Sequence, residues 1–266
     1  MSVGQAPANR ASIAGKASVD QRQSERRLPP ATVGGVQLLV DVRRVLGSVA
    51  DRALDLALPA ACAGCGREGP ALCAECAPAF DIRLSAEPGV PIGLPADIPA
   101  PLLQLEWCAP FTGTTRRALH ALKYHGERRI APYVGAAVAR RWARAGAGGD
   151  LLVPVPASPD RVRDRGYDQA ALIATEAGRR LRVPVLNALE RTRSTTAQFD
   201  LDRNERASNL DRAFQVRELA RADVGGRWIV LVDDVVTTGT TLAACAAALL
   251  DAGAAAVSAI AGARER

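Results

Sequence analysis

The chain has 266 residues, with 48% hydrophobic and only 4% aromatic residues, so it is long enough for one large domain whose core is filled by Ala, Leu and Val. The formal net charge is +6, and eight basic residues against a single acid lie between Arg116 and Arg144. Such a patch is typical either of a surface for phosphate-rich partners or of a solvated helix face.

The chain shows no sign of export or of membrane insertion. The first thirty residues lack the apolar segment of a secretory signal. The most apolar stretch, residues 242–262, is interrupted by Asp251 and Gly253 and predicts a helix, a turn and a strand. We therefore expect no membrane span and a cytoplasmic location, where disulfides are rare.

The N-terminal third divides by composition into three segments. Residues 1–34 are polar and basic without periodicity, which predicts a disordered tail. Residues 35–85 hold an amphipathic helix over Val36–Leu58, followed by a cysteine-rich segment. Residues 86–102 are rich in proline and predict a linker. We expect this linker to separate the core of the cysteine segment from the core of the following domain.

Four cysteines follow the pattern C-x₂-C-x₇-C-x₂-C, namely Cys62, Cys65, Cys73 and Cys76. Thiolates at this spacing are typical of a tetrahedral Zn²⁺ site in a small ribbon that needs the metal to fold. An iron–sulfur cluster and a pair of disulfides are the alternatives. Cys108 and Cys245 stand alone in the sequence and are expected to be core residues.

Residues 103–266 alternate between helical and strand patterns, which predicts an α/β domain with a parallel sheet flanked by helices. The expected helices are Thr115–His125, Arg128–Ala145, Gly166–Leu181 and Thr240–Ala252. The expected strands are Leu151–Pro156, Val183–Leu186, Trp228–Asp233 and Ala254–Gly262.

Two adjacent carboxylates, Asp233 and Asp234, end one of these strands, and ligands bind at this edge of a parallel sheet. Loop capping and a receiver-type Mg²⁺ site are the alternatives for this pair. The cluster that follows opens a helix, so its unpaired N–H groups and hydroxyls favour a phosphate; it consists of Thr237, Thr238, Gly239, Thr240 and Thr241. Carboxylates beside a phosphate loop suit the hydroxyls and the phosphate of a ribose 5-phosphate.

The run "IVLVDDVVTTGTTL" resembles the phosphoribosyl pyrophosphate (PRPP) motif of type I phosphoribosyltransferases. The resemblance implies that Asp233 and Asp234 hold the ribose hydroxyls with Mg²⁺, and that Thr237–Thr241 hold the 5-phosphate. Members that act on 6-oxopurines usually carry an aspartate at the position of Thr237. The threonine here disfavours a hypoxanthine–guanine activity and leaves the acceptor open.

Two further loops match this resemblance. Residues 153–169 would form the pyrophosphate loop, which carries Arg161, Arg163 and Arg165 before a helix; Arg161 and Arg165 are the candidates for binding the diphosphate. Residues 189–214 form a long polar loop that would close over PRPP and exclude water. Its candidate contacts include the catalytic candidate Arg191 and also Arg193, Thr195, Gln198 and Arg206.

Three more blocks precede the PRPP motif: "LKYHGER", "VPVP…RGYDQA" and "RTRSTTAQ…AF". With the four cysteines, they make residues 54–262 similar to the ComF family. This resemblance implies a type I phosphoribosyltransferase fold with an N-terminal zinc ribbon, and it adds Lys123 to the PRPP-binding candidates.

The main functional hypothesis is a Mg²⁺-dependent phosphoribosyltransferase that displaces pyrophosphate from PRPP in favour of an unknown acceptor. The alternative implied by the family is a competence protein that acts in DNA uptake, binds single-stranded DNA or DNA-uptake proteins, and uses PRPP as a ligand or signal. A PRPP sensor without catalysis is a third hypothesis. Base-stacking aromatic residues are few, which mildly disfavours dedicated single-strand binding.

Overall fold

The computed structural model describes residues 61–88, 98–192 and 213–265. The expected basic tail, the amphipathic helix over Val36–Leu58 and residues 89–97 of the linker lie outside these ranges. No helix in the described ranges combines the length and the hydropathy needed to cross a bilayer.

A four-stranded parallel sheet forms the centre of the domain, so the predicted α/β class is confirmed. Its strands run in the order β1 (Leu105–Pro110), β6 (Ala256–Arg264), β5 (Trp228–Val236) and β2 (Leu151–Pro154). β1 was not among the predicted strands. The strand predicted over Val183–Leu186 is reduced to one parallel bridge, from Val185 to Leu152.

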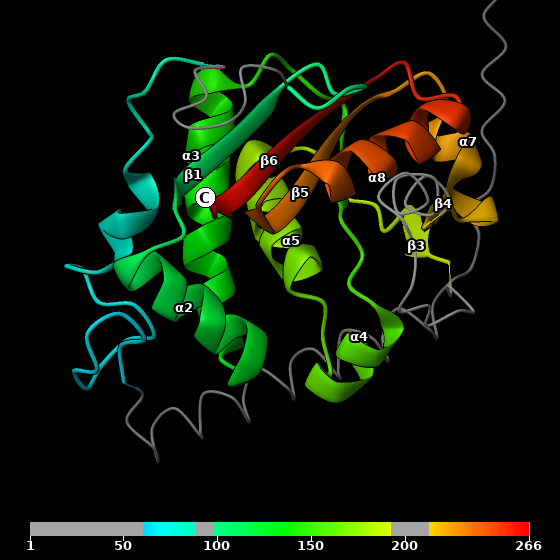
Figure 1. Cartoon of the computed structure of the whole chain (residues 1–266). Coiled ribbons are helices and arrows are strands. Elements are labelled where there is room, and N and C mark those ends of the chain that lie inside the picture. Colours follow the sequence, from blue (N-terminus) through cyan, green and yellow to red (C-terminus); the bar gives the residue numbers. More distant parts are fainter. Residues whose placement is uncertain (1–60, 89–97, 193–212, 266) are drawn as a thin grey trace, which may run out of the picture. The chain divides into compact units, whose positions relative to one another are not determined.

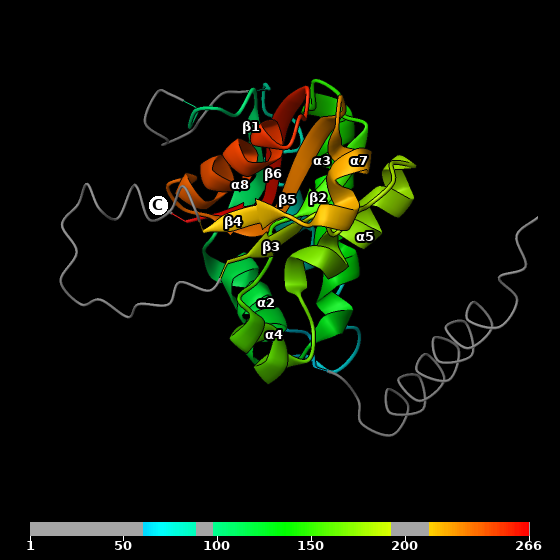
Figure 2. The same cartoon turned by 90° about the vertical axis from the view of Figure 1, so that its right-hand side faces the viewer.

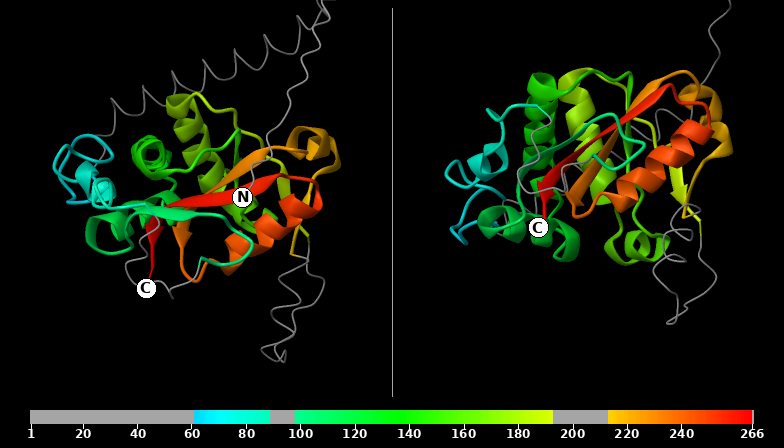
Figure 3. Two further views of the ribbon diagram at one scale, coloured as in Figure 1. Left: turned by 90° about the horizontal axis from the view of Figure 1, so that it is seen from above. Right: turned by 45° about the horizontal axis from the view of Figure 1, so that its top comes forward.

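Helices cover one face of the sheet, and a helix with a short β-ribbon covers the other (Figures 1, 2 and 3). The first face carries α2 (Gly113–Tyr124), α3 (Ala131–Ala145) and α5 (Gln169–Leu181). The second carries α8 (Thr240–Asp251) and the antiparallel ribbon of β3 (Leu189–Arg191) with β4 (Phe214–Val216). The short elements are η1 (Ala77–Asp81), η2 (Arg128–Ile130), α4 (Pro159–Arg165), η3 (Glu218–Ala220) and α7 (Arg221–Val224).

Alternating residues of β5 separate the two cores. Val230 and Val232 pack on the side of α3 and α5, whereas Ile229 and Leu231 pack on the side of α8. All four side chains are fully buried. The strand is thus apolar throughout its first part, as expected for a parallel strand that is covered on both faces.

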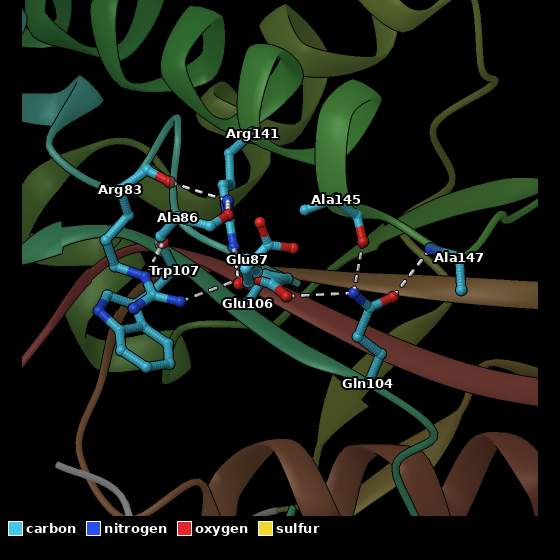
Figure 4. A network of polar contacts seen from close by, with 9 residues as sticks. All are labelled: Arg83, Ala86, Glu87, Gln104, Glu106, Trp107, Arg141, Ala145 and Ala147. Carbon is cyan, nitrogen blue, oxygen red and sulfur yellow. Dashed lines mark hydrogen bonds and ion pairs between the residues drawn. The ribbon is translucent and has the colours of Figure 1, made fainter. Parts of the chain in front are cut away.

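A buried ion pair ties β1 to α3 (Figure 4). Glu106, the second residue of β1, accepts two hydrogen bonds from Arg141 of α3 at 2.6 and 3.0 Å, and Arg83 lies 3.7 Å away. Arg141 also donates to the backbone carbonyls of Arg83, Ala86 and Glu87. A charge left unpaired in this core would be strongly destabilising, so Glu106 and Arg141 depend on each other. Through its bonds to the three carbonyls, Arg141 also fixes residues 83–87 next to α3.

The cysteine segment shares the first core instead of having its own. Cys62, Leu72 and Phe80 belong to the same buried cluster as Leu119 and Leu122 of α2. The expectation that the proline-rich linker separates two cores is therefore wrong. A segment this short has too little apolar surface for an independent core, so it packs its few large side chains against the neighbouring helices.

Candidate functional site

The two adjacent carboxylates lie inside β5, which continues to Val236 beyond its predicted end. Since successive side chains of a strand point to opposite faces, Asp233 lies on the α8 side and Asp234 on the α2 side. Asp234 is only 3% exposed, and Asp233 is half-buried. The two carboxylates therefore lie on opposite faces of the sheet, near its carboxyl edge.

Asp234 is paired on one side only. Its Oδ1 atom lies 3.0 Å from Nζ of Lys123, in the last turn of α2. Its Oδ2 atom is buried and has no hydrogen-bond partner among the described residues. A buried carboxylate oxygen without a partner is costly, so this atom is suited to accept a hydrogen bond from a ligand.

Asp233 is held in a less favourable electrostatic environment. Burial, and then the neighbouring charge of Asp234, raise the pKa of Asp233 well above its ordinary range. The backbone N–H of Asp234 donates to Oδ1 of Asp233 at 2.8 Å, and Lys123 also favours the ionised form, but both effects are smaller. A group that favours or accompanies the charged carboxylate, such as a bound hydroxyl or Mg²⁺, would relieve this penalty.

The threonine cluster forms the turn between β5 and α8. Gly239 caps the helix with φ +82°, a conformation that a residue with a side chain rarely adopts. It is also closely approached by Pro99, at 2.7 Å from the position of a Cβ atom. Exposed hydroxyls surround this buried glycine and the first-turn N–H groups of α8; they belong to Thr237, Thr238, Thr240 and Thr241. The arrangement is suited to an anion.

The predicted pyrophosphate loop contains a helix that was not predicted. Ser158 caps α4, Pro159 begins it and Gly166 ends it with φ +76°. Arg161 and Arg165 are four residues apart and therefore share one side of α4. Arg165 donates to Gln169 at 3.0 Å, whereas Arg161 is exposed.

The base of the predicted lid is the β3–β4 ribbon. Arg191 is exposed and lies over the ring of Phe214 at 5.6 Å. Burial, and then the charge of Asp233, raise the pKa of the Cys245 thiol on α8, while the charge of Arg191 lowers it. Asp233 and Arg191 are thus both close enough to Cys245 to change its pKa. Gln198, like Arg193, Thr195 and Arg206, lies outside the described residues.

The four cysteines of the ribbon converge on one point. Their Sγ atoms all lie within 4.8 Å of one another, and those of Cys65 and Cys73 are 3.8 Å apart. A tetrahedral metal with bonds of about 2.3 Å to sulfur requires separations of about 3.8 Å, so the donor set fits such a metal. The described residues contain no other group of three or more potential ligands of this kind.

Local backbone geometry prepares these thiols for a metal. Burial opposes ionisation of Cys62, but N–H groups, including that of Cys73 at 3.3 Å, outweigh it and lower its pKa to about 6. Burial raises the pKa of Cys76 to about 12, so this thiol needs a cation to ionise. Gly64 leaves room for the Cys76 sulfur, which would lie 2.6 Å from an added Cβ atom.

The structure thus brings together Asp233, Asp234, Lys123 and the threonine turn, and it places the four cysteines in a separate cluster. Tyr124 and Tyr167 belong to the sequence blocks that resemble the ComF family, but the sequence predicts no role for them. Tyr167 donates its hydroxyl hydrogen bond to the Leu122 carbonyl, beside Lys123. The sequence offered one sign of this contact, namely a tyrosine within the arginine-rich loop predicted over residues 153–169.

Known proteins resemble the chain in its sequence. The family profile of the phosphoribosyl transferase domain matches residues 169–265. Competence protein F of Haemophilus influenzae is 37% identical over 94 residues, which are 35% of this chain and 41% of that protein. The DNA utilization protein YhgH of Escherichia coli O157:H7 is 32% identical over 203 residues, 74% of this chain and 85% of that protein.

A solved structure that is similar is a glutamine PRPP amidotransferase from B. subtilis, in complex with ADP and GMP. It is 20% identical with a TM-score of 0.36, and the match covers 50% of this chain and 26% of the other. The alignment with competence protein F spans less than half of that relative, but the alignment with YhgH spans most of its length. With its phosphoribosyl transferase domain and its four-cysteine cluster, the chain belongs to the ComF family.

Proposed function

We propose that this protein binds Mg²⁺–PRPP and transfers the phosphoribosyl group to an acceptor, with release of pyrophosphate. The observation that carries the proposal is the half-satisfied Asp234 carboxylate next to the threonine turn, in a chain with a phosphoribosyl transferase domain. The free oxygen of Asp234 accepts a ribose hydroxyl, and Asp233 accepts the second one. The threonine turn, with Gly239 at its centre, binds the 5-phosphate.

The departing diphosphate is bound by the cations around this edge. Arg161 and Arg165 of α4 would bind it, together with Arg191 at the base of the predicted lid. Gln198 lies outside the described residues and stays a candidate from the sequence alone. Lys123 pairs with Asp234 at 3.0 Å and supplies a further positive charge. When bound, Mg²⁺ neutralises the diphosphate and makes it a better leaving group. Charge builds up on the pyrophosphate in the transition state, so contacts made there accelerate transfer.

The cysteine cluster would hold one structural Zn²⁺. Its role follows from the small size of the segment, whose described residues 61–85 contain a single short 3₁₀-helix and share their core with α2. Tetrahedral thiolate sites take zinc or iron–sulfur centres, and the closed set of four protein ligands leaves no open position for catalysis. We propose zinc rather than an iron–sulfur centre, because a purely structural site requires no redox chemistry.

A calorimetric titration tests the proposal. The wild-type protein should bind PRPP in the presence of Mg²⁺, and it should release pyrophosphate when an accepted base or amine is supplied. The acceptor is found by screening a panel of nucleobases and amines for this release. Binding without release for any acceptor would favour a PRPP sensor, and absence of binding would overturn the proposal.

Arg165→Ala and Arg191→Ala should each weaken Mg²⁺–PRPP binding by the value of one charge-assisted contact, about 1.5–3 kcal/mol. Ribose 5-phosphate lacks the diphosphate, so both variants should bind it as wild type does. Arg163→Ala is the matched control, since Arg163 lies on the same helix and is paired with Asp160 at 2.7 Å. Equal losses for PRPP and ribose 5-phosphate would separate these arginines from the diphosphate.

A second candidate function is the binding of single-stranded DNA in DNA uptake. It is favoured by the names of the relatives and by a pocket of about 510 Å³ beside the ribbon, whose basic lining includes Arg116, Arg117, His120 and His125. Binding of this kind depends on phosphate contacts and falls steeply with salt. Retention of a labelled oligonucleotide at low salt, and its loss in an Arg116→Ala, Arg117→Ala double variant, would support it.

A further inference from the structure

A pair of tyrosines and a pair of arginines connect the end of α2 to the turn between α4 and α5. The Arg128 guanidinium lies 4.6 Å from the ring centre of Tyr167, and that of Arg165 lies 5.1 Å from the ring centre of Tyr124. Each segment thus gives one arginine and one aromatic ring to the other. We call this set of four residues the clasp.

The hydroxyl of Tyr167 makes the most specific contact of the clasp. It donates to the carbonyl of Leu122 in the last turn of α2. Carbonyls in the last turn of a helix have no partner within the helix. The N–H of His125 makes the last α-helical hydrogen bond, to the carbonyl of Ala121, and the N–H of Glu127 donates to the same carbonyl. The hydroxyl of Tyr167 is therefore a donor for the Leu122 carbonyl, to which neither of these two N–H groups donates.

The position of this bond links two halves of the proposed PRPP site. Leu122 is the neighbour of Lys123, which pairs with Asp234 on the ribose side. Tyr167 follows Arg165 by two residues, across the left-handed Gly166. The ring of Tyr167 is 7% exposed and belongs to the same core as Leu122, so it is fixed by packing as well as by its hydroxyl.

We infer that Tyr167 is a positioning residue for the binding of Mg²⁺–PRPP. Its hydrogen bond to α2 holds α4, which carries the proposed diphosphate contacts, at the correct distance from Lys123 and Asp234. It touches no reacting atom and acts through the position of α4, whose Arg165 donates to Gln169 at 3.0 Å and lies over the ring of Tyr124. The inference rests on the proposed function of the site and adds a residue to it. Without the hydroxyl, only the packing of the tyrosine ring and the arginine contacts of the clasp would hold α4 to α2, and the distance between them would be less well fixed.

Tyr167→Phe isolates the hydroxyl, because it keeps the ring and its contact with Arg128. The variant should bind Mg²⁺–PRPP about threefold to tenfold more weakly, as expected for the loss of one hydrogen bond. Its affinity for ribose 5-phosphate should stay that of wild type. The chain has three tyrosines, and Tyr133→Phe on α3 is the matched control that should change neither affinity.

A double-mutant cycle separates positioning from a purely structural role. If Tyr167 acts through Arg165, the losses of Tyr167→Phe and Arg165→Ala in PRPP affinity should not add. A structural role alone would lower the melting temperature and leave PRPP affinity unchanged, which would overturn the inference. Additive losses, or equal losses for ribose 5-phosphate, would overturn it as well.

The failure of the proposed function has a different signature. If wild type itself does not bind Mg²⁺–PRPP, the proposed function and the positioning role fall together. If wild type binds and Tyr167→Phe binds equally well, only the positioning role is wrong. Hydrogen exchange of residues 155–168 checks the cause, since the exchange should be faster in Tyr167→Phe and unchanged in Tyr133→Phe.

Discussion

Asp233→Asn should weaken Mg²⁺–PRPP binding by about tenfold to a hundredfold while the melting temperature stays the same or rises. The change removes a charged acceptor of the ribose hydroxyls, and each such hydrogen bond contributes about 1.5–3 kcal/mol. It also removes a charge that burial and Asp234 disfavour. An amide oxygen can still accept the N–H of Asp234, so the turn should keep its shape.

The gain in stability should depend on pH in a definite direction. The folded-state pKa of Asp233 is raised, so the folded protein binds this proton more tightly than the unfolded chain does. The wild type therefore loses stability as pH rises from about 4 through that raised pKa. Urea unfolding across this range should show the advantage of Asp233→Asn growing with pH and vanishing near pH 4.

Asp234→Asn should also weaken PRPP binding but with a lower melting temperature. It leaves Lys123 without its partner at a site where the lysine side chain is only 20% exposed. Asp251→Asn, at the exposed end of α8, is the control that should change neither property. Tight Mg²⁺–PRPP binding by the Asp233→Asn, Asp234→Asn double variant would contradict the assignment of this site.

Cys62→Ser should remove the metal and destabilise the whole described domain in one transition. Structural zinc contributes about 10–16 kcal/mol in small cysteine sites, which is comparable to the total stability of a domain, about 5–15 kcal/mol. Cys62 is 1% exposed in the core that includes Leu119 and Leu122, so loss of the ribbon also uncovers α2. Metal analysis and calorimetric unfolding measure the two effects.

Cys108→Ser is the matched control for this experiment. Cys108 is equally buried in the same core, but it is not one of the four clustered thiols. It should keep about one Zn²⁺ per chain and lose only the stability expected for a buried hydroxyl. A ribbon that melts separately from an unshifted sheet would contradict the shared core, and a brown protein containing iron would contradict zinc.

Local sequence was sufficient for the elements whose signals are local. The start of the strand before Asp233 and both ends of the helix after Gly239 were predicted to within a residue, because an apolar run and a glycine turn mark them, whereas the strand itself continues to Val236. The helix α4 was missed although Ser158, Pro159 and Gly166 are its start and stop signals. The arginines between them were interpreted as residues of a phosphate-binding loop, so these helix start and stop signals were not considered.

Other features depend on partners that are distant in the sequence. β1 carries the fully buried Glu106 near its start, and a charge there argues against a buried strand unless Arg141 is known to face it. The pairing of Lys123 with Asp234 joins residues of different layers in the same way. The place of the two carboxylates and the threonine turn in the chain could therefore be predicted, whereas the cation that pairs with Asp234 could not.

The position of β6 has a consequence for the order in which the protein can be assembled during translation. β6 is the last strand along the chain, yet it lies between β1 and β5. When Pro110 leaves the ribosome, β1 has no partner strand until Ala256 follows it. The hydrogen-bonding edge of β1 therefore stays unpaired while the residues between Pro110 and Ala256 are made, and slower elongation would lengthen the time for which this apolar strand is open to aggregation.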